Sequence, residues 1–172
     1  MTLSEISELA DVGSYLFLAE LVRRLKPVHI LELGTGAGRS ADYMMQALPP
    51  KSRLTTINWP NPPSGDDVGL YLSEWRGHPG LRMITGDTAD QETAARVVPN
   101  VDMMLIDSTH TAEHVAKEWA MYEPKLADRA IVLVDDLHMY DLMEWWVNLP
   151  YDKIVTEVRS YGLGVFQYVR KP

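Results

Sequence analysis

Acidic residues stand at the ends of three short apolar runs, in the segments ILELGTGAG, MMLIDSTH and AIVLVDD. They are Glu32, Asp107 and the pair Asp135 and Asp136. The carboxyl ends of parallel strands lie along one edge of a sheet, so we expect these side chains to converge on one crevice. Carboxylates in such a crevice can bind a hard divalent cation or accept hydrogen bonds from an ammonium group.

A glycine-rich turn follows the first of these runs, with glycines at positions 34, 36 and 38. Glycine permits positive φ and lets a ligand approach the backbone closely. The spacing is G-x-G-x-G, and no Lys-Ser or Lys-Thr pair follows, which excludes a P-loop. Glu32 would repel a pyrophosphate but accept hydrogen bonds from an ammonium group. The turn therefore favours S-adenosylmethionine over NAD; a tight strand-to-helix turn without a ligand is the alternative.

The segment ILELGTGAGRS resembles motif I of the class I S-adenosylmethionine-dependent methyltransferases, and the resemblance covers nearly the whole chain. In that family the motif surrounds the cofactor. The resemblance therefore implies that S-adenosylmethionine contacts Glu32, Gly34, Thr35, Gly36 and Gly38.

The same resemblance implies cofactor contacts after the second and third strands. Asn58 stands where the family normally has an acid that binds the ribose hydroxyls, and an amide can still bind one hydroxyl. Trp59 is expected either to stack on adenine or to anchor the loop. Asp87 is expected either to accept a hydrogen bond from the adenine amine or to cap the next helix.

The segment from Asp107 to His110, together with Asp135 and Asp136, resembles the metal-binding signature of cation-dependent small-molecule O-methyltransferases. These include the catechol and caffeoyl-CoA enzymes and, closer still, the cephalosporin-hydroxylase-like group. The resemblance implies Mg²⁺ (or Ca²⁺) bound by Asp107, Asp135 and Asp136, with Asp107 also beside the cofactor. A bound cation would lower the pKa of a substrate hydroxyl. The alternatives are that Asp107 caps its strand and Asp136 caps the next helix.

His110 is the predicted general base, because the catechol-type enzymes have a lysine three residues after the first acid. An imidazole titrates near neutral pH and can take the proton of a hydroxyl. His110 and His114 also form the sequence H-x-x-E-H of the inverted zinc peptidases. That signature needs both histidines on one helix, whereas His110 directly follows a predicted strand, so zinc-peptidase chemistry is not expected.

Composition narrows the partners of this 172-residue chain, which has the length of a single domain, 1–172. The net charge of -8 disfavours nucleic acid, and the lack of cysteine excludes disulfides and thiolate metal sites. The polar N-terminal segment is unlike a secretory signal, and no apolar run is long enough to span a bilayer. We therefore expect a cytoplasmic protein whose partner is a small-molecule hydroxyl substrate, with no membrane involved.

Strands and helices alternate in the predicted element order. The predicted helices are 4–25, 40–48, a segment ending near 75, 91–98, 111–126 and 138–148. The predicted strands are 28–33, 53–57, 81–85, 101–106, 130–134, 154–158 and 164–169, the last two joined without a helix. This order predicts an α/β fold with a Rossmann-like, doubly wound seven-stranded sheet, mostly parallel with an antiparallel C-terminal hairpin strand.

Taken together, these features favour S-adenosylmethionine-dependent, metal-assisted O-methylation. Two alternatives remain, the first of which is motivated by Asn58 and by the lack of a large insertion after the fifth strand. One is another S-adenosylmethionine-using enzyme on this fold, a lyase or a hydroxylase-like relative; the other is a non-catalytic cofactor-binding module. Trp145 and Trp146 on the last helix are expected in the core or at the face of a homodimer.

Overall fold

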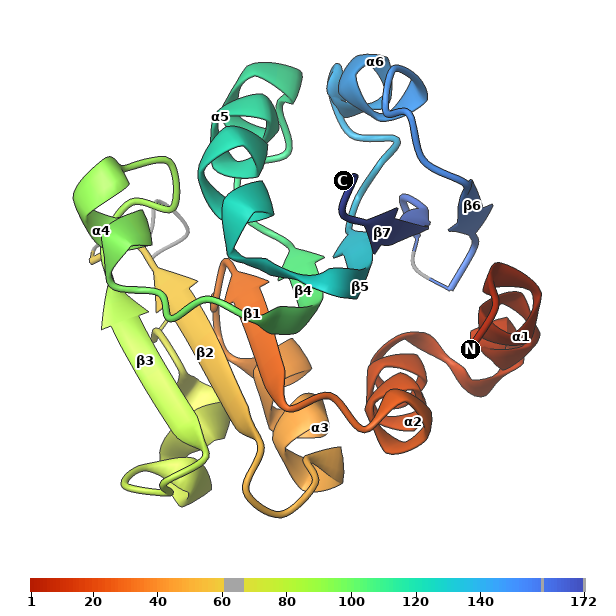
Figure 1. Ribbon diagram of the computed structural model, residues 1–172. Helices are drawn as coiled ribbons and strands as arrows, with labels where there is room; N and C mark the ends of the chain where they lie inside the picture. Colours follow the sequence, from red (N-terminus) through yellow and green to blue (C-terminus); the bar gives the residue numbers. More distant parts are fainter. Residues whose placement is uncertain (61–66, 159, 172) are drawn as a thin grey trace.

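A computed structural model describes residues 1–60, 67–158 and 160–171 (Figure 1). Its described residues form a seven-stranded sheet in the order β3-β2-β1-β4-β5-β7-β6. The strands are β1 (His29–Leu33), β2 (Arg53–Asn58), β3 (Leu81–Thr85), β4 (Val101–Ile106), β5 (Leu126–Val134), β6 (Lys153–Thr156) and β7 (Leu163–Val169). Strands β1 to β5 pair in parallel, and β7 runs antiparallel to both β5 and β6. The predicted fold class is confirmed.

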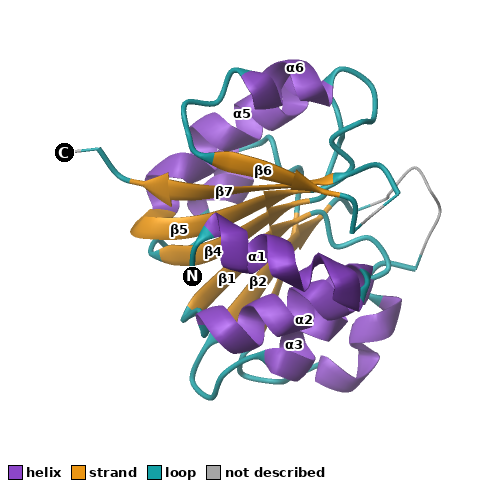
Figure 2. Cartoon of the chain, turned by 90° about the vertical axis from the view of Figure 1, so that its right-hand side faces the viewer, coloured by secondary structure: helices purple, strands orange, loops and turns teal. Residues whose placement is uncertain are grey.

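Helices cover both faces of this sheet (Figure 2). The first face is covered by α1 (Leu3–Ser7), the 3₁₀ helix η1 (Glu8–Val12), α2 (Ser14–Leu25), α3 (Arg39–Ala47) and the 3₁₀ helix η2 (Leu70–Trp75). The opposite face is covered by α4 (Gln91–Ala95), α5 (Ala112–Tyr122), the short 3₁₀ helix η3 (Glu123–Lys125) and α6 (Leu142–Val147).

Side chains alternate between these two layers along each central strand. In β1, Ile30 packs into the α2 and α3 layer, whereas Leu31 and Leu33 pack into the α5 and α6 layer. In β4 the neighbours Met103 and Met104 likewise pack into opposite layers, because successive side chains of a strand point to opposite faces of the sheet. The central strands β1 and β4 are therefore buried on both sides, whereas the edge strand β3 is mostly exposed.

The predicted helix 4–25 is wrong as one continuous element. Gly13 has a φ of 87°, outside the helical region, and it separates η1 from α2. The helix predicted to end near residue 75 is a 3₁₀ helix rather than an α-helix. In both places the spacing of the apolar residues predicts which face of the helix is buried. It does not predict where the backbone leaves the α conformation.

Three further helices are shorter than predicted, and the first of them, α4, ends at Ala95 rather than at residue 98. Helix α5 ends at Tyr122 because Pro124 follows in η3, and Leu126, predicted on the helix, begins β5. Helix α6 begins at Leu142 rather than near residue 138, after Tyr140, which has a φ of 47°. The extra residues of β5 lengthen the central sheet.

The two tryptophans of α6 belong to the core. Trp146 is 3% exposed and Trp145 packs against the same apolar cluster. Of the two expectations for this pair, core or dimer face, the structure bears out the core, and the homodimer stays a prediction. None of the helices among the described residues is both long enough and apolar enough to cross a bilayer.

His29 is a fully buried histidine at the start of β1. Its Nε2 lies 3.0 Å from Thr55 Oγ1, and its Nδ1 lies 3.4 Å from Arg53 Nη2. Since the guanidinium can only donate, Nδ1 is the acceptor and Nε2 carries the proton. Burial, and after it the charge of Arg53, lowers the pKa of His29 to about 4.

We expect His29 to make the protein less stable in acid. Between pH 6.5 and about 4, the unfolded histidine binds a proton that the folded one does not, so unfolding becomes more favourable as the pH falls. The shift corresponds to about 3 kcal/mol near pH 4. Urea denaturation of the wild type and of His29→Gln at pH 7.5 and pH 4 isolates this effect from the carboxylates common to both. A difference in stability between the two proteins that does not change with pH would contradict the assignment.

Candidate active site

The turn between β1 and α3 lies against the end of β2. Gly34 and Gly36 have φ values of 102° and 49°, in the region that glycine adopts without strain. The amides of Gly34 and Thr35 donate to the Ile57 carbonyl at 2.9 and 3.0 Å. These bonds hold the turn at the carboxyl edge of the sheet.

The turn also touches the end of β4. A Cβ on Gly34 would lie 1.9 Å from the backbone carbonyl oxygen of Asp107, so only glycine fits there. The Asp107 amide in turn donates to the Leu33 carbonyl at 2.8 Å. The glycine turn and the first predicted metal-binding acid are therefore in direct backbone contact.

Glu32 lies beneath the turn rather than on its surface. Its side chain is 0% exposed, and its Oε2 accepts a hydrogen bond from Thr56 Oγ1 at 2.5 Å. Thr56 Oγ1 also lies 2.6 Å from Thr35 Oγ1. The structure links Glu32 to the turn through the hydroxyl groups of Thr56 and Thr35, and its contact with the cofactor stays a prediction.

Asn58 supports the turn from the other side. Its Oδ1 accepts from the Gly36 amide at 3.0 Å, and its Nδ2 donates to the Trp59 carbonyl at 2.7 Å. Trp59 is 48% exposed, which does not fit the loop-anchor alternative. Both residues border a pocket that also includes Gly34 and Gly36.

Three pockets along this edge share Asp107. The inner pocket, of about 170 Å³, is bordered by Gly34, Gly36, Ile57, Asn58, Trp59, Thr88, Asp107, Ser108 and Thr109. The turn pocket, of about 430 Å³, is bordered by residues 34–40 and by Tyr15, Leu70, Tyr71 and Asp107. The acidic pocket, also of about 430 Å³, is bordered by Tyr15, Asp107, Asp135, Asp136, Val158, Ser160 and Tyr161. Asp107 thus stands where all three meet.

His110 lies between two of the predicted acids. Its Nε2 is 3.5 Å from Asp107 Oδ1 and 3.6 Å from Asp136 Oδ2. Burial lowers the pKa of His110, but the nearby carboxylate of Asp107, followed by the charges of Asp136 and Asp135, raises it, and the pKa ends above its ordinary value. The imidazole is therefore a stronger base here than in water.

The predicted metal ligands share a pocket but do not form a ready-made metal site. Across residues 1–60, 67–158 and 160–171, no group of three or more histidine, aspartate or glutamate side chains is arranged to hold a metal ion. The described arrangement instead places an imidazole beside Asp107 and Asp136. The N-cap of α6 is Asp141, so the alternative of Asp136 as that cap is wrong.

Asp87 is not the cap of the next helix either, because Asp90 caps α4 by accepting from the Thr93 amide. The Asp87 carboxylate accepts from the Ala89 amide at 2.8 Å, and the neighbouring Thr88 borders the inner pocket.

The zinc-peptidase alternative fails as expected, since α5 begins at Ala112 and His110 lies outside it.

Several residues that border these pockets were not predicted from the sequence, among them Thr88, Ser108 and Tyr15. Thr88 and Ser108 directly follow singled-out acids at strand ends, and that position was the available signal. Tyr15 looked like a core residue of a helix, yet it borders both the turn pocket and the acidic pocket. Nothing in the local sequence distinguishes Tyr15 from the apolar positions around it.

A family model described as a methyltransferase domain matches residues 31–137, which is more than half of the chain. The chain therefore belongs to this methyltransferase domain family and is an enzyme of the methyltransferase class. The matched residues include the glycine turn and the acidic residues Glu32, Asp107, Asp135 and Asp136.

Solved structures agree with this fold. A methyltransferase from Geobacter sulfurreducens has a TM-score of 0.73 at 14% identity, covering 98% of this chain and 89% of that one. The O-methyltransferase TomG from Streptomyces achromogenes, solved with S-adenosylmethionine, has a TM-score of 0.70 at 20% identity, with coverages of 98% and 89%. The O-methyltransferase from Bacillus cereus, solved with S-adenosylhomocysteine, has a TM-score of 0.68 at 16% identity, with coverages of 90% and 80%. No curated protein matches the chain.

The two glycines of the turn should respond differently to alanine. Gly34→Ala places a methyl group on the Asp107 carbonyl at a strained φ, so we expect a loss of about 3 kcal/mol of stability or more. Gly36→Ala meets nothing within 4 Å and should cost only about 1 kcal/mol through its φ. Urea denaturation measures both. Equal losses for the two variants would contradict the proposed contact between the turn and Asp107.

Proposed function

We propose that this methyltransferase uses S-adenosylmethionine to methylate a hydroxyl group on a small molecule. The observation that carries the proposal is the place of Asp107, which borders the inner, turn and acidic pockets together. A methyl donor beside the glycine turn and an acceptor beside His110 would then meet at this residue. TomG and the Bacillus cereus protein, both named as O-methyltransferases, share the fold and support this assignment.

In this proposal the inner and turn pockets hold the cofactor. The open backbone at Gly36 admits its amino-acid end, since a Cβ there would meet no protein atom within 4 Å. Trp59 offers an exposed ring for adenine, and Asn58 borders the same pocket with one amide oxygen already used by the turn. Thr35 and Gly38 border the turn pocket, while Glu32 acts beneath it.

The acidic pocket would hold the acceptor. The hydroxyl oxygen attacks the methyl group of the sulfonium, the S–CH₃ bond breaks, and the O–CH₃ bond forms. The hydroxyl proton passes to His110, and the products are the methyl ether and S-adenosylhomocysteine. Asp107 and Asp136 stabilise the resulting imidazolium at the 3.5 and 3.6 Å separations observed.

Assistance by Mg²⁺ or Ca²⁺ is a separate part of the proposal. It is supported by Asp107, Asp135 and Asp136 bordering one pocket, because carboxylate oxygens suit these ions. These side chains would have to rearrange around an ion, since the described residues form no ready-made group of ligands. The proton transfer to His110 does not depend on it.

The function is tested by release of S-adenosylhomocysteine from S-adenosylmethionine in the presence of catechol, phenol and sugar acceptors, with EDTA or with added Mg²⁺. We expect release that depends on an acceptor. Methylthioadenosine or homoserine lactone formed from the cofactor alone would instead identify a lyase. Rates that are equal with EDTA and with Mg²⁺ would reject the metal proposal and leave methyl transfer intact.

Replacing Asp107 should separate chemistry from cofactor binding. For Asp107→Asn we expect the transfer rate to fall about 100-fold or more, because His110 loses the carboxylate that stabilises its charge. The dissociation constant for S-adenosylhomocysteine, measured by calorimetry, should stay within about threefold of wild type, less than 1 kcal/mol. His110→Gln should behave in the same way.

Asp128→Asn is the control, because Asp128 is an exposed acid paired with Arg170, outside the residues that border the three pockets. It should leave both measurements unchanged. If Asp107→Asn weakened binding as much as it slowed transfer, Asp107 would have a structural role rather than a catalytic one.

A further inference from the structure

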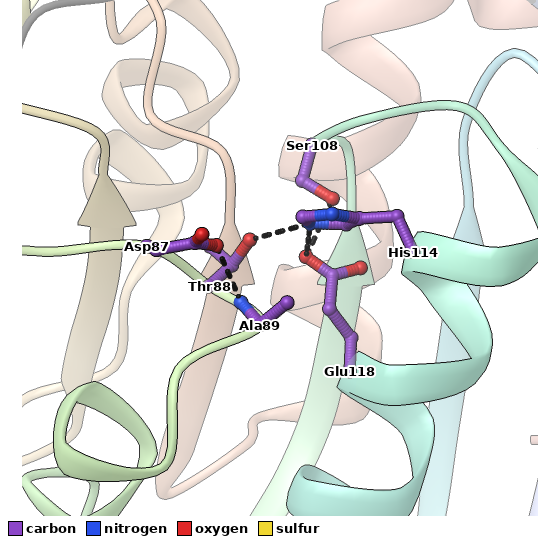
Figure 3. A network of polar contacts seen from close by, with 6 residues as sticks. All are labelled: Asp87, Thr88, Ala89, Ser108, His114 and Glu118. Carbon is purple, nitrogen blue, oxygen red and sulfur yellow. Dashed lines mark hydrogen bonds and ion pairs between the residues drawn. The ribbon is translucent and has the colours of Figure 1, made fainter.

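Figure 3 shows a network of polar contacts, partly buried, that includes Thr88 and Ser108 of the inner pocket. Ser108 Oγ donates to Glu118 Oε1 at 2.6 Å, and His114 Nε2 lies 3.2 Å from the same oxygen. Thr88 Oγ1 lies 3.1 Å from His114 Nε2. The network joins the loop after β3, the residue after Asp107 and the first turns of α5.

This network is poorly explained by stability alone. Glu118 is 0% exposed on a helix whose neighbouring buried residues are Val115 and Tyr122. Its Oε1 serves both Ser108 and His114, while its Oε2 has no hydrogen-bond partner among the described residues. Burying a carboxylate is costly, and an apolar replacement of similar volume is often neutral or stabilising.

The network ends on two residues of the inner pocket. Thr88 and Ser108 both border it, and they come from segments that follow different strands. Helix α5 connects them through His114 and Glu118. The hydrogen bond to Glu118 raises the pKa of His114 despite partial burial, which favours the ion pair.

The hydrogen bonds also fix which way each hydroxyl points. The Ser108 proton is donated to Glu118, so Ser108 can only accept from a group in the pocket. A carboxylate accepts only, so His114 Nε2 carries a proton, and Thr88 accepts from it at 3.1 Å. The Thr88 proton then remains available to the pocket. The side of the inner pocket formed by these two residues therefore offers one hydrogen-bond acceptor, Ser108, and one hydrogen-bond donor, Thr88.

We propose that Glu118 and His114 are positioning residues that set this acceptor and donor pair for the adenine edge of the cofactor. The inference rests on the proposed function, since it concerns how the same pocket recognises S-adenosylmethionine. Adenine presents an amine donor beside a ring-nitrogen acceptor. Hypoxanthine presents the reverse, a carbonyl acceptor beside an N–H donor, and the fixed hydroxyls would reject it.

The test compares the binding of S-adenosylhomocysteine and S-inosylhomocysteine by calorimetry. The wild type should prefer the adenosyl ligand by about tenfold or more, which corresponds to about 1.4 kcal/mol. In Glu118→Leu the Ser108 hydroxyl is free to turn, so the preference should fall to within about twofold while the melting temperature stays the same or rises. Glu118→Gln keeps an acceptor oxygen and should restore most of the preference.

Glu113→Leu is the matched control, since it removes an exposed glutamate from the same helix, and it should leave the preference unchanged. Should Glu118→Leu fail to fold, Ser108→Ala removes the same acceptor without altering α5 and should show the same loss. The inference is overturned if Glu118→Leu or Ser108→Ala keeps the wild-type preference. If the wild type binds neither ligand, the proposed function fails first.

Discussion

The candidate site depends on one close backbone contact, in which Gly34 lies against the carbonyl of Asp107. A methyl group at Gly34 would come within 1.9 Å of that oxygen, so the ends of β1 and β4 can approach only where residue 34 has no side chain. This contact lies at the point where the strand order reverses, between β1 and β4. In doubly wound sheets, this is the position at which a crevice opens for a ligand. The glycine turn and the acidic pocket are neighbours because of it.

The polar groups around this contact form two sets, one fully buried and one that faces a pocket. Residues such as Glu32 and Glu118 are fully buried and act through hydroxyl groups of Thr56 and Ser108. Asp107 and Asp136 face a pocket and hold His110 between them. Glu32 and Glu118 have hydroxyl or imidazole partners close by, which offset part of their desolvation. The charge needed for chemistry is thus kept at the sheet edge, while the layers on either side remain apolar.

Much of the fold could be predicted from the sequence because strand order and burial follow from hydrophobic spacing. The end of α5 could not, because the pattern of Val115, Trp119 and Tyr122 continues to Leu126, which is buried as a strand residue instead. The helix caps could not be predicted either: capping was the alternative role of Asp87 and Asp136, but Asp90 and Asp141 are the N-cap residues. Which of several nearby acids caps a helix depends on backbone angles that side-chain type does not fix.

The candidate site, like the fold, could be predicted from the sequence only in part. The convergence of Gly36, Asp107 and Asp135 followed from their positions at strand ends. The supporting role of Glu32 did not, since it depends on Thr56 of a neighbouring strand, and a pairing between strands is invisible in a local motif. The place of Tyr15 and the link from Ser108 to Glu118 likewise need the tertiary structure.

The most direct measurement is a crystal structure of the protein grown with S-adenosylhomocysteine. We predict that the amino-acid end lies beside Gly36, the nucleoside in the inner pocket between Trp59 and Ser108, and the sulfur toward Asp107. Ligand density at the opposite edge of the sheet, near Lys26 and Arg129, would contradict it. So would a structure in which the Gly34 turn and Asp107 are separated and open onto different surfaces.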